Sequence, residues 1–204
     1  MRSNFGRKFI HGPSHTQVVN LSGREAGAEI VEACRGGDRL AFRGLYDLYK
    51  DRVYSIALYF FHGDRVTASE VTQQVFLKLL ANISQFRGQS EFSTWLYRLV
   101  VNACLDEARS RKPLVPLHER SQLEAVAGTD SPETQYERAQ VGSSVRAAVA
   151  SLPPKFRIAV LLRYFDDLSY EEMAKALRCS MGTVASRLNR GHKMLAERLK
   201  GVLE

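Results

Sequence analysis

The 204-residue chain lacks the features that would indicate a membrane or secreted protein. No window is apolar over the roughly 18 residues that a membrane-spanning helix needs, and the N-terminus has no apolar core typical of secretory signals. Cysteine is rare, since only Cys34, Cys104 and Cys179 occur, far apart and without metal-ligand spacing. We therefore expect no membrane insertion and reduced thiols in a cytoplasmic protein, with a redox-sensing cysteine pair as the alternative.

The chain also lacks the signatures of β-structure and of catalysis. No stretch shows the alternating apolar and polar pattern of strands, so the expected fold class is all-α. The sequence contains no catalytic carboxylate pair, no metal-ligand cluster and no phosphate-binding loop. We expect a protein that is not an enzyme and that binds no metal and no cofactor.

Charge is distributed unevenly along the chain. The formal net charge is +7 and the pI is about 9.5, which favours a polyanionic partner. Residues 1–24 carry four basic and no acidic side chains, and residues 178–200 carry six basic and one acidic. Residues 113–140 reverse the sign, with five acidic and two basic side chains. If these charges served only to keep the surface solvated, the sign of the charge would not be expected to alternate between segments.

Breaks in the helical pattern divide the chain into four segments. Residues 1–27 are expected to form a mobile basic tail, because they lack periodicity and contain glycine and proline. Residues 28–112 have apolar side chains at helical spacing, which predicts a first helical domain. Residues 113–136 contain three prolines and predict a flexible acidic linker. Residues 137–204 are expected to form a second helical domain.

The first domain is predicted to contain helices over about 28–62, 66–83 and 91–111. A Gly36-Gly37-Asp38 turn splits the first of these ranges. Leu48 belongs to the predicted inward stripe of that range, as Val71 and Leu79 do in the next one. Ser90 is predicted to cap the third helix.

The stretch from Leu168 to Lys200 has the pattern of a helix-turn-helix. Ser169 followed by Glu172 forms a capping box that begins a short helix. After a tight turn, a basic second helix places Val184 and Leu188 on one apolar stripe. Two helices in this order are typical of a DNA-binding unit.

Two helix faces in the first domain carry polar groups that suit partners. Gln73 and Lys78 lie on the outer face of the 66–83 helix, although the pattern fits a plain solvated face equally well. Arg98, Asn102 and Arg109 share one face of the next helix, beside a loop flanked by aromatic residues. Amide, guanidinium and aromatic groups together suit a nucleic-acid strand with unstacked bases. Core packing with a charged surface is the alternative for this face.

Two stretches resemble the extracytoplasmic-function (ECF, group 4) sigma factors of the sigma-70 family. Residues 39–112 resemble region two through Ala41-Phe42, Leu45-Tyr46, Tyr49, Gln74 to Leu79, Phe86-Arg87-Gly88, Thr94 to Arg98, Asn102, Asp106 and Arg109. Residues 139–200 resemble region four through Leu152-Pro153, Arg157, Leu162-Arg163-Tyr164, Leu168 to Ala174, Gly182-Thr183-Val184 and Ser186-Arg187-Leu188. The span that holds both covers about four fifths of the chain.

The resemblance implies a cytoplasmic bacterial protein of stress response that binds core RNA polymerase and directs it to minus-10 and minus-35 promoter elements. The implied partners are the β′ clamp helices and β flap of the polymerase, promoter DNA and an anti-sigma factor. Docking on the β′ clamp is implied for Gln73, Gln74, Phe76, Leu77 and Lys78. Minus-10 binding is implied for Phe86, Arg87, Gln89, Ser90, Phe92, Arg98, Asn102 and Arg109. Minus-35 binding is implied for Thr183, Ala185, Ser186, Arg187, Asn189, Arg190 and Lys193.

The sequence departs from the family pattern at two places that bear on these roles. The helix at 66–80 has fewer acidic residues than the family usually has, so the balance of polymerase docking is expected to differ. Ala185 and Asn189 stand where basic or larger residues are common. Because alanine offers only a methyl contact and asparagine pairs with adenine, we expect a distinct minus-35 sequence.

Other functional classes fit the sequence less well. A one-component helix-turn-helix regulator, which binds DNA without docking on polymerase, would share the last helices but predicts a sensor or dimerisation domain in the first half. A helical adaptor that binds no DNA disagrees with the charge distribution.

Overall fold

The computed structural model describes residues 21–88, 90–111 and 132–200. The first half of the fold comprises α1 (Leu21–Arg35), α2 (Arg39–Phe60), α3 (Arg65–Asn82), the short 3-10 helix η1 (Ile83–Gln85) and α4 (Phe92–Ser110). The second half comprises α5 (Pro132–Ala150), α6 (Pro154–Phe165), α7 (Tyr170–Ala176) and α8 (Met181–Leu199). These ranges contain no strand, which confirms the predicted all-α class.

Side-chain caps account for where several helices begin. Asp38 accepts hydrogen bonds from the amides of Leu40 and Ala41 at the start of α2. Ser169 and Glu172 form the predicted capping box of α7, with both reciprocal bonds present. Each such cap satisfies backbone N–H groups that the first helical turn leaves unpaired.

Some predicted boundaries and caps differ from the structure. Helix α1 begins at Leu21, inside the predicted tail, because it packs against α2 and η1 and buries Val31. Helix α5 begins at Pro132, inside the predicted linker. The predicted cap at Ser90 was wrong, since α4 begins at Phe92 and its first turn has no side-chain cap. Tertiary packing extends helices beyond what local sequence indicates.

The apolar core runs through both halves as one contiguous cluster. The row predicted to face inward from α3 is buried, with Val71 and Leu79 fully inaccessible. Leu48 of α2 is half exposed instead of inward, because the buried stripe of that helix passes through Leu45, Val53 and Ile56. Within the described ranges, no helix has the length and apolarity that a membrane crossing requires.

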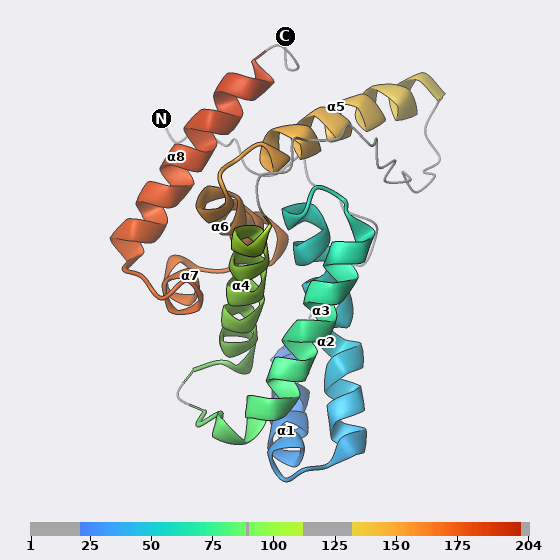
Figure 1. Ribbon diagram of the computed structural model, residues 1–204, viewed down its shortest axis with the longest axis vertical. Helices are drawn as coiled ribbons and strands as arrows, with labels where there is room; N and C mark the ends of the chain where they lie inside the picture. The colour runs from blue at the N-terminus through green and yellow to red at the C-terminus, as the bar shows by residue number, and fades with distance from the viewer. Residues whose placement is uncertain (1–20, 89, 112–131, 201–204) are drawn as a thin grey trace.

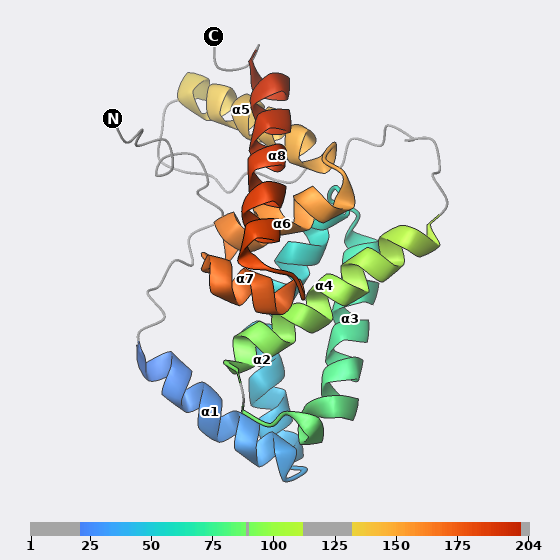
Figure 2. The ribbon, with the colours of Figure 1, turned by 90° about the vertical axis from the view of Figure 1, so that its left-hand side faces the viewer.

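The two halves lie against each other rather than apart. Helix α2 contacts α6, and α4 contacts α7, which lies beside it in Figure 1. Turned by 90°, the molecule has α1 at one end and α5 with α8 at the other (Figure 2). The middle of the molecule therefore contains the contact between halves.

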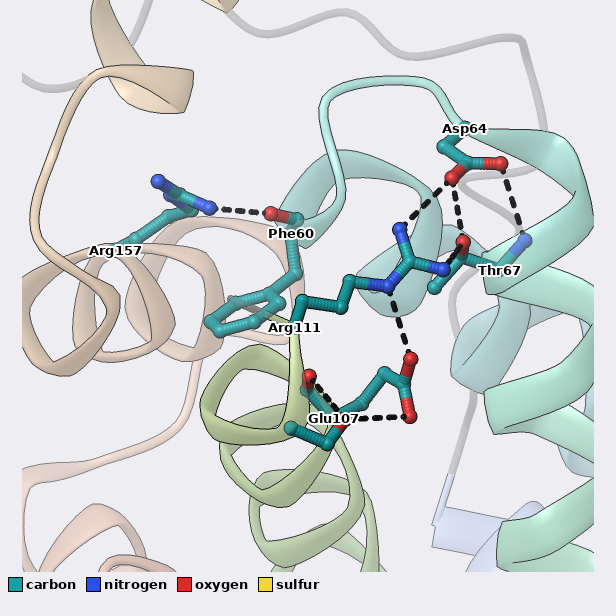
Figure 3. Close-up of polar contacts among 7 residues, drawn as sticks. Phe60, Asp64, Thr67, Glu107, Arg111 and Arg157 are labelled. Carbon is teal, nitrogen blue, oxygen red and sulfur yellow. Dashed lines mark hydrogen bonds and ion pairs between the residues drawn. The ribbon is translucent and has the colours of Figure 1, made fainter. Parts of the chain in front are cut away.

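Arg111 ties the end of α4 to the start of α3 (Figure 3). Its guanidinium lies 3.1 Å from the Asp64 carboxylate and 2.9 Å from that of Glu107, and it also donates to the Thr67 hydroxyl. Asp64 in turn caps α3 through the Thr67 amide. Partial burial acts to raise the pKa of Asp64, but the bonds from Thr67 and Arg111 outweigh it and lower that pKa. The cluster fixes the point where the first half ends.

Candidate nucleic-acid interface and docking groove

Helix α8 is seated on α6 by a small set of buried contacts. Ser180 caps its first turn by accepting a hydrogen bond from the Thr183 amide. Val184 and Leu188 are buried, and buried Gly191 lets the two helices approach closely. A Cβ atom at position 191 would lie 3.1 Å from Cγ2 of Val160, which explains why a glycine stands inside a helix.

Replacing Gly191 with leucine should destabilise the second half. The larger side chain would collide with Val160 and displace α8, and overpacking of this kind costs about 1–3 kcal/mol. Urea unfolding of Gly191→Leu, compared with wild type, measures that loss. Ala196→Leu, a similar enlargement at an exposed position of the same helix, is the control and should leave stability within about 0.5 kcal/mol. Equal effects of the two variants would contradict the tight contact.

The outward face of α8 carries most of the side chains predicted to bind the minus-35 element. Ser186, Asn189, Arg190 and Lys193 are exposed and follow one another at helical spacing. In the described residues, no hydrogen bond or ion pair engages the last three, so their polar groups are available to a ligand. The Ser186 hydroxyl instead donates to the Thr183 carbonyl oxygen 3.0 Å away.

The remaining predicted residues of α8 lie at the edge of this face. Thr183, Ala185 and Arg187 are half-buried. The hydroxyl of Thr183 lies 3.0 Å from that of Ser180, inside the cap. Ser186, Asn189, Arg190 and Lys193 are therefore exposed, whereas Thr183, Ala185 and Arg187 are partly covered by the rest of the protein.

The loop before α4 is held by an aromatic cluster. The rings of Phe86 and Phe92 are buried, with centroids 5.6 Å apart, and each packs on Trp95 at 5.5 and 5.9 Å. Their faces are thus occupied by one another, so they shape the loop and are not free to stack on a base. Gly88 has a φ of 67°, in the left-handed region that glycine adopts without strain.

The other residues predicted for the minus-10 element lie on the loop and on one side of α4. Arg87 is exposed and Ser90 half-buried, whereas Gln89 lies outside the described residues. Asn102 and Arg109 are exposed on α4, and Arg98 is half-buried. Arg109 forms an ion pair with Asp106 at 2.6 Å, which offsets part of the positive charge of this face.

A groove of about 500 Å³ runs between α2 and α3. Its lining includes Gln73, Phe76 and Leu77, three of the five residues predicted to dock on polymerase. Leu77 is 58% exposed, although it is a large apolar side chain. Gln74 and Lys78 are exposed on the same helix but do not line the groove. An apolar groove with polar edges is the form of surface that accepts an amphipathic helix.

The sequence analysis did not predict that α2 forms the other side of this groove. Tyr46 packs edge-on against Phe76, with ring centroids 4.7 Å apart, and Lys50 lies over the Tyr46 ring. Tyr54 lines the groove one turn further along. A repeat of large side chains every four residues, at Phe42, Tyr46, Lys50 and Tyr54, was the available signal.

The three cysteines form no disulfide in the structure. Cys34 and Cys104 are buried and Cys179 is half-buried, and all three are free thiols. Burial raises the pKa of Cys104 to about 12, so that thiol stays protonated and unreactive at neutral pH. No cluster of three or more metal-binding side chains occurs in the described part of the chain.

Two family models match the chain, one in each half. Residues 45–113 match "Sigma-70 region 2", and residues 143–195 match "Sigma-70, region 4". The first range holds most of the groove, the aromatic cluster and the polar face of α4, and the second holds most of the helix-turn-helix.

Relatives match over most of their own lengths. The chain is 32% identical over 188 residues to an RNA polymerase sigma-H factor of Pseudomonas aeruginosa, covering 88% of this chain and 97% of that protein. It is 30% identical over 183 residues to the ECF RNA polymerase sigma factor SigW of Bacillus subtilis, covering 83% and 95%. An ECF RNA polymerase sigma-E factor of Escherichia coli K12 is 32% identical over 185 residues, covering 85% and 94%.

Solved structures share the fold at lower identity. CnrH, solved with the cytosolic domain of CnrY, is 20% identical with a TM-score of 0.63, covering 86% of this chain and 98% of that one. The sigma factor RpoE of Bartonella quintana, solved with the anti-sigma factor NepR, is 20% identical with a TM-score of 0.59, covering 78% and 96%.

Proposed function

We propose a mechanism for this chain from one premise: it belongs to the extracytoplasmic-function sigma factors of the sigma-70 family. As such, it is an alternative sigma factor that binds core RNA polymerase and directs it to promoter DNA. The observation that supports the mechanism is that each half has an exposed surface of its own. The groove of α2 and α3 and the outward face of α8 lie on different halves of one chain.

The groove is proposed to dock on the β′ clamp helices of the polymerase. An amphipathic helix could place apolar side chains against Tyr46, Phe76 and Leu77 and keep its polar side at the groove edges. The second half is proposed to contact the β flap. Helix α3 contains a single acidic residue, Glu70, so apolar contact rather than charge is expected to supply most of the affinity.

Promoter recognition is proposed to use two surfaces of modest strength. Asn189 and Arg190 of α8 would contact base edges or phosphates of the minus-35 element, with Lys193 adding a phosphate contact. Arg87 and Ser90 of the loop, with the polar face of α4, would bind the separated minus-10 strand. Extruding a base costs a few kcal/mol, which contacts in the loop must offset. Because polymerase aligns both surfaces, neither has to bind tightly alone.

Three further expectations complete the proposal. The acidic segment 113–136, which lies largely outside the described residues, would pass through the polymerase channel near the RNA exit. The RNA chemistry would belong to the polymerase, so this chain would act in the cytoplasm as a binding factor and not as an enzyme. An anti-sigma factor is the expected inhibitory partner.

Run-off transcription with core polymerase tests the function. Promoter-specific transcripts are expected only when the protein is present. A one-component regulator would instead bind DNA tightly and specifically by itself, with no effect on transcription by core polymerase. That second outcome would refute the proposal.

Replacing Arg190 with alanine should lower promoter-specific transcription about tenfold or more and leave core binding unchanged. A base or phosphate contact from an exposed arginine is worth about 1–3 kcal/mol. Arg198→Ala, an exposed arginine near the end of α8, is the matched control and should keep near-normal transcription. Loss of core binding by Arg190→Ala would show that this residue is structural.

A further inference from the structure

Arg111 stands at the point where the chain leaves the first half. It follows the end of α4 at Ser110, its backbone is extended with a φ of −73° and a ψ of 106°, and the next described residue is Pro132 at the start of α5. Residues 112–131 connect these two points. The contacts that hold Arg111 therefore fix where this connection begins.

The Arg111 side chain is bound to the turn that leads from α2 into α3. One terminal nitrogen lies 3.1 Å from Oδ2 of Asp64, and the other donates to the Thr67 hydroxyl (Figure 3). The guanidinium also lies over the Phe61 ring, 5.6 Å from its centroid. Phe61 and Thr67 are buried, so these contacts join Arg111 to the core of the first half.

Arg111 also closes the last turn of α4. Its Nε lies 2.9 Å from Oε1 of Glu107, and its backbone N–H donates to the Glu107 carbonyl oxygen at 3.2 Å. The hydroxyl of Ser110 donates to the same carbonyl oxygen at 2.9 Å. The last carbonyl groups of a helix otherwise lack protein partners, and helix ends fray. Arg111 therefore keeps residues 107–110 helical while it binds the start of α3.

The limited length of the connection makes its starting point important. A chain of the length of residues 112–131 spans at most about 70 Å when it is fully extended. Elements centred at minus-10 and minus-35 are about 25 base pairs apart, or about 85 Å of B-form DNA. Because the reach of the connection is of the same order as this distance, any residues added to it lengthen the promoter that both halves can bind together.

Unwinding the last turn of α4 would lengthen the connection by a definite amount. Four residues rise about 6 Å along a helix axis but span about 14 Å when extended. The gain of about 8 Å corresponds to about two base pairs of B-form DNA. The contacts of Arg111 with Asp64, Thr67 and Glu107 oppose this unwinding.

We propose that Arg111 is a positioning residue that sets the upper limit of the spacing between the promoter elements that this chain accepts. It sets the limit by fixing the start of the connection at the end of α4. The proposal rests on the proposed function, because spacing matters only if both halves bind promoter DNA.

Run-off transcription from promoters that differ only in spacing tests this role. The full-length protein with core polymerase is compared on a promoter of optimal spacing and on versions about two base pairs shorter and longer. For Arg111→Ala, transcription from the longer promoter, divided by that from the optimal one, should rise about fivefold over wild type, because loss of two ion pairs lets the last turn unwind. The same ratio for the shorter promoter should not change.

Arg35→Ala is the matched control. Arg35 also forms an ion pair within the first half, with Glu32 at 2.7 Å, but it lies at the end of α1 and far in sequence from the connection. Its loss should leave both ratios at their wild-type values. Circular dichroism should show that both variants keep the wild-type helix content.

A compensating deletion gives a second readout. Removing two residues from segment 112–131 of the Arg111→Ala chain takes back about 7 Å and should restore the wild-type ratios. Transcription by Arg111→Ala that falls equally at every spacing, or a ratio for the longer promoter that does not rise, would overturn the proposal and leave the proposed function standing. Wild-type protein that yields no promoter-specific transcript at any spacing would refute the proposed function, and the role of Arg111 with it.

Discussion

Replacing Leu77 with aspartate is expected to weaken binding to core RNA polymerase by about 100-fold or more. Leu77 is 58% exposed and lines the groove between α2 and α3. Burying a leucine in an interface contributes about 1.5–3 kcal/mol, and a buried unpaired carboxylate adds a further penalty. A combined loss of about 3 kcal/mol corresponds to about two orders of magnitude in affinity. Fluorescence anisotropy of labelled protein titrated with core polymerase measures it.

Leu40→Asp is the matched control for this measurement. Leu40 is also a leucine of the first half and is 81% exposed, but it does not line the groove. The Leu40→Asp variant should therefore bind core polymerase with wild-type affinity. Both variants should keep the wild-type circular dichroism spectrum. Equal binding by Leu77→Asp and wild type would show that polymerase docks elsewhere on the chain.

Replacing Arg157 with methionine is expected to lower the free energy of unfolding by about 3 kcal/mol. The Arg157 guanidinium donates to the carbonyl oxygens of Phe60, Ala150 and Leu152, and the residue is buried. Hydrogen bonds from a charged donor contribute about 1.5–3 kcal/mol each, and methionine leaves these carbonyls unpaired. Removing the buried charge also removes its desolvation cost, which offsets part of that sum. The buried apolar volume of the arginine stem is kept. Urea unfolding followed by circular dichroism gives the change.

Lys155→Met is the control for the loss of charge near the start of α6. Lys155 is exposed, two residues before Arg157, and lies over the Phe156 ring. Its replacement should change stability by less than about 0.5 kcal/mol. Burial lowers the pKa of Arg157 to about 10, so the arginine is still charged at pH 7, where the comparison is made. If the two variants unfold alike, Arg157 does not connect the halves.

Local features of the fold were predictable because they depend on neighbours in sequence. The capping box of Ser169 and Glu172 follows from side chains three residues apart, and the buried row of α3 follows from helical spacing. The outward face of α8 was predictable for the same reason, since Val184 and Leu188 fix which side faces the core.

Features that depend on tertiary contact were not predictable from such patterns. Leu48 matches the inward period of α2 but is half exposed, because the buried stripe is decided by where α1 and α3 pack. Phe86 and Phe92 look free to stack on a base in sequence, yet both rings pack on Trp95. Tyr97 donates a hydrogen bond to Asp166, 69 residues away, and no local pattern links the two. The contact between halves is therefore the feature that most needed a structure.

A DNA footprint with and without core polymerase tests the central claim most directly. The account predicts that the protein with core polymerase protects two separate promoter segments about 25 base pairs apart, and that the protein alone protects neither strongly. Arg190→Ala should reduce protection of the upstream segment more than protection of the downstream segment. A single segment protected as strongly by the free protein as by the complex with polymerase would contradict the account.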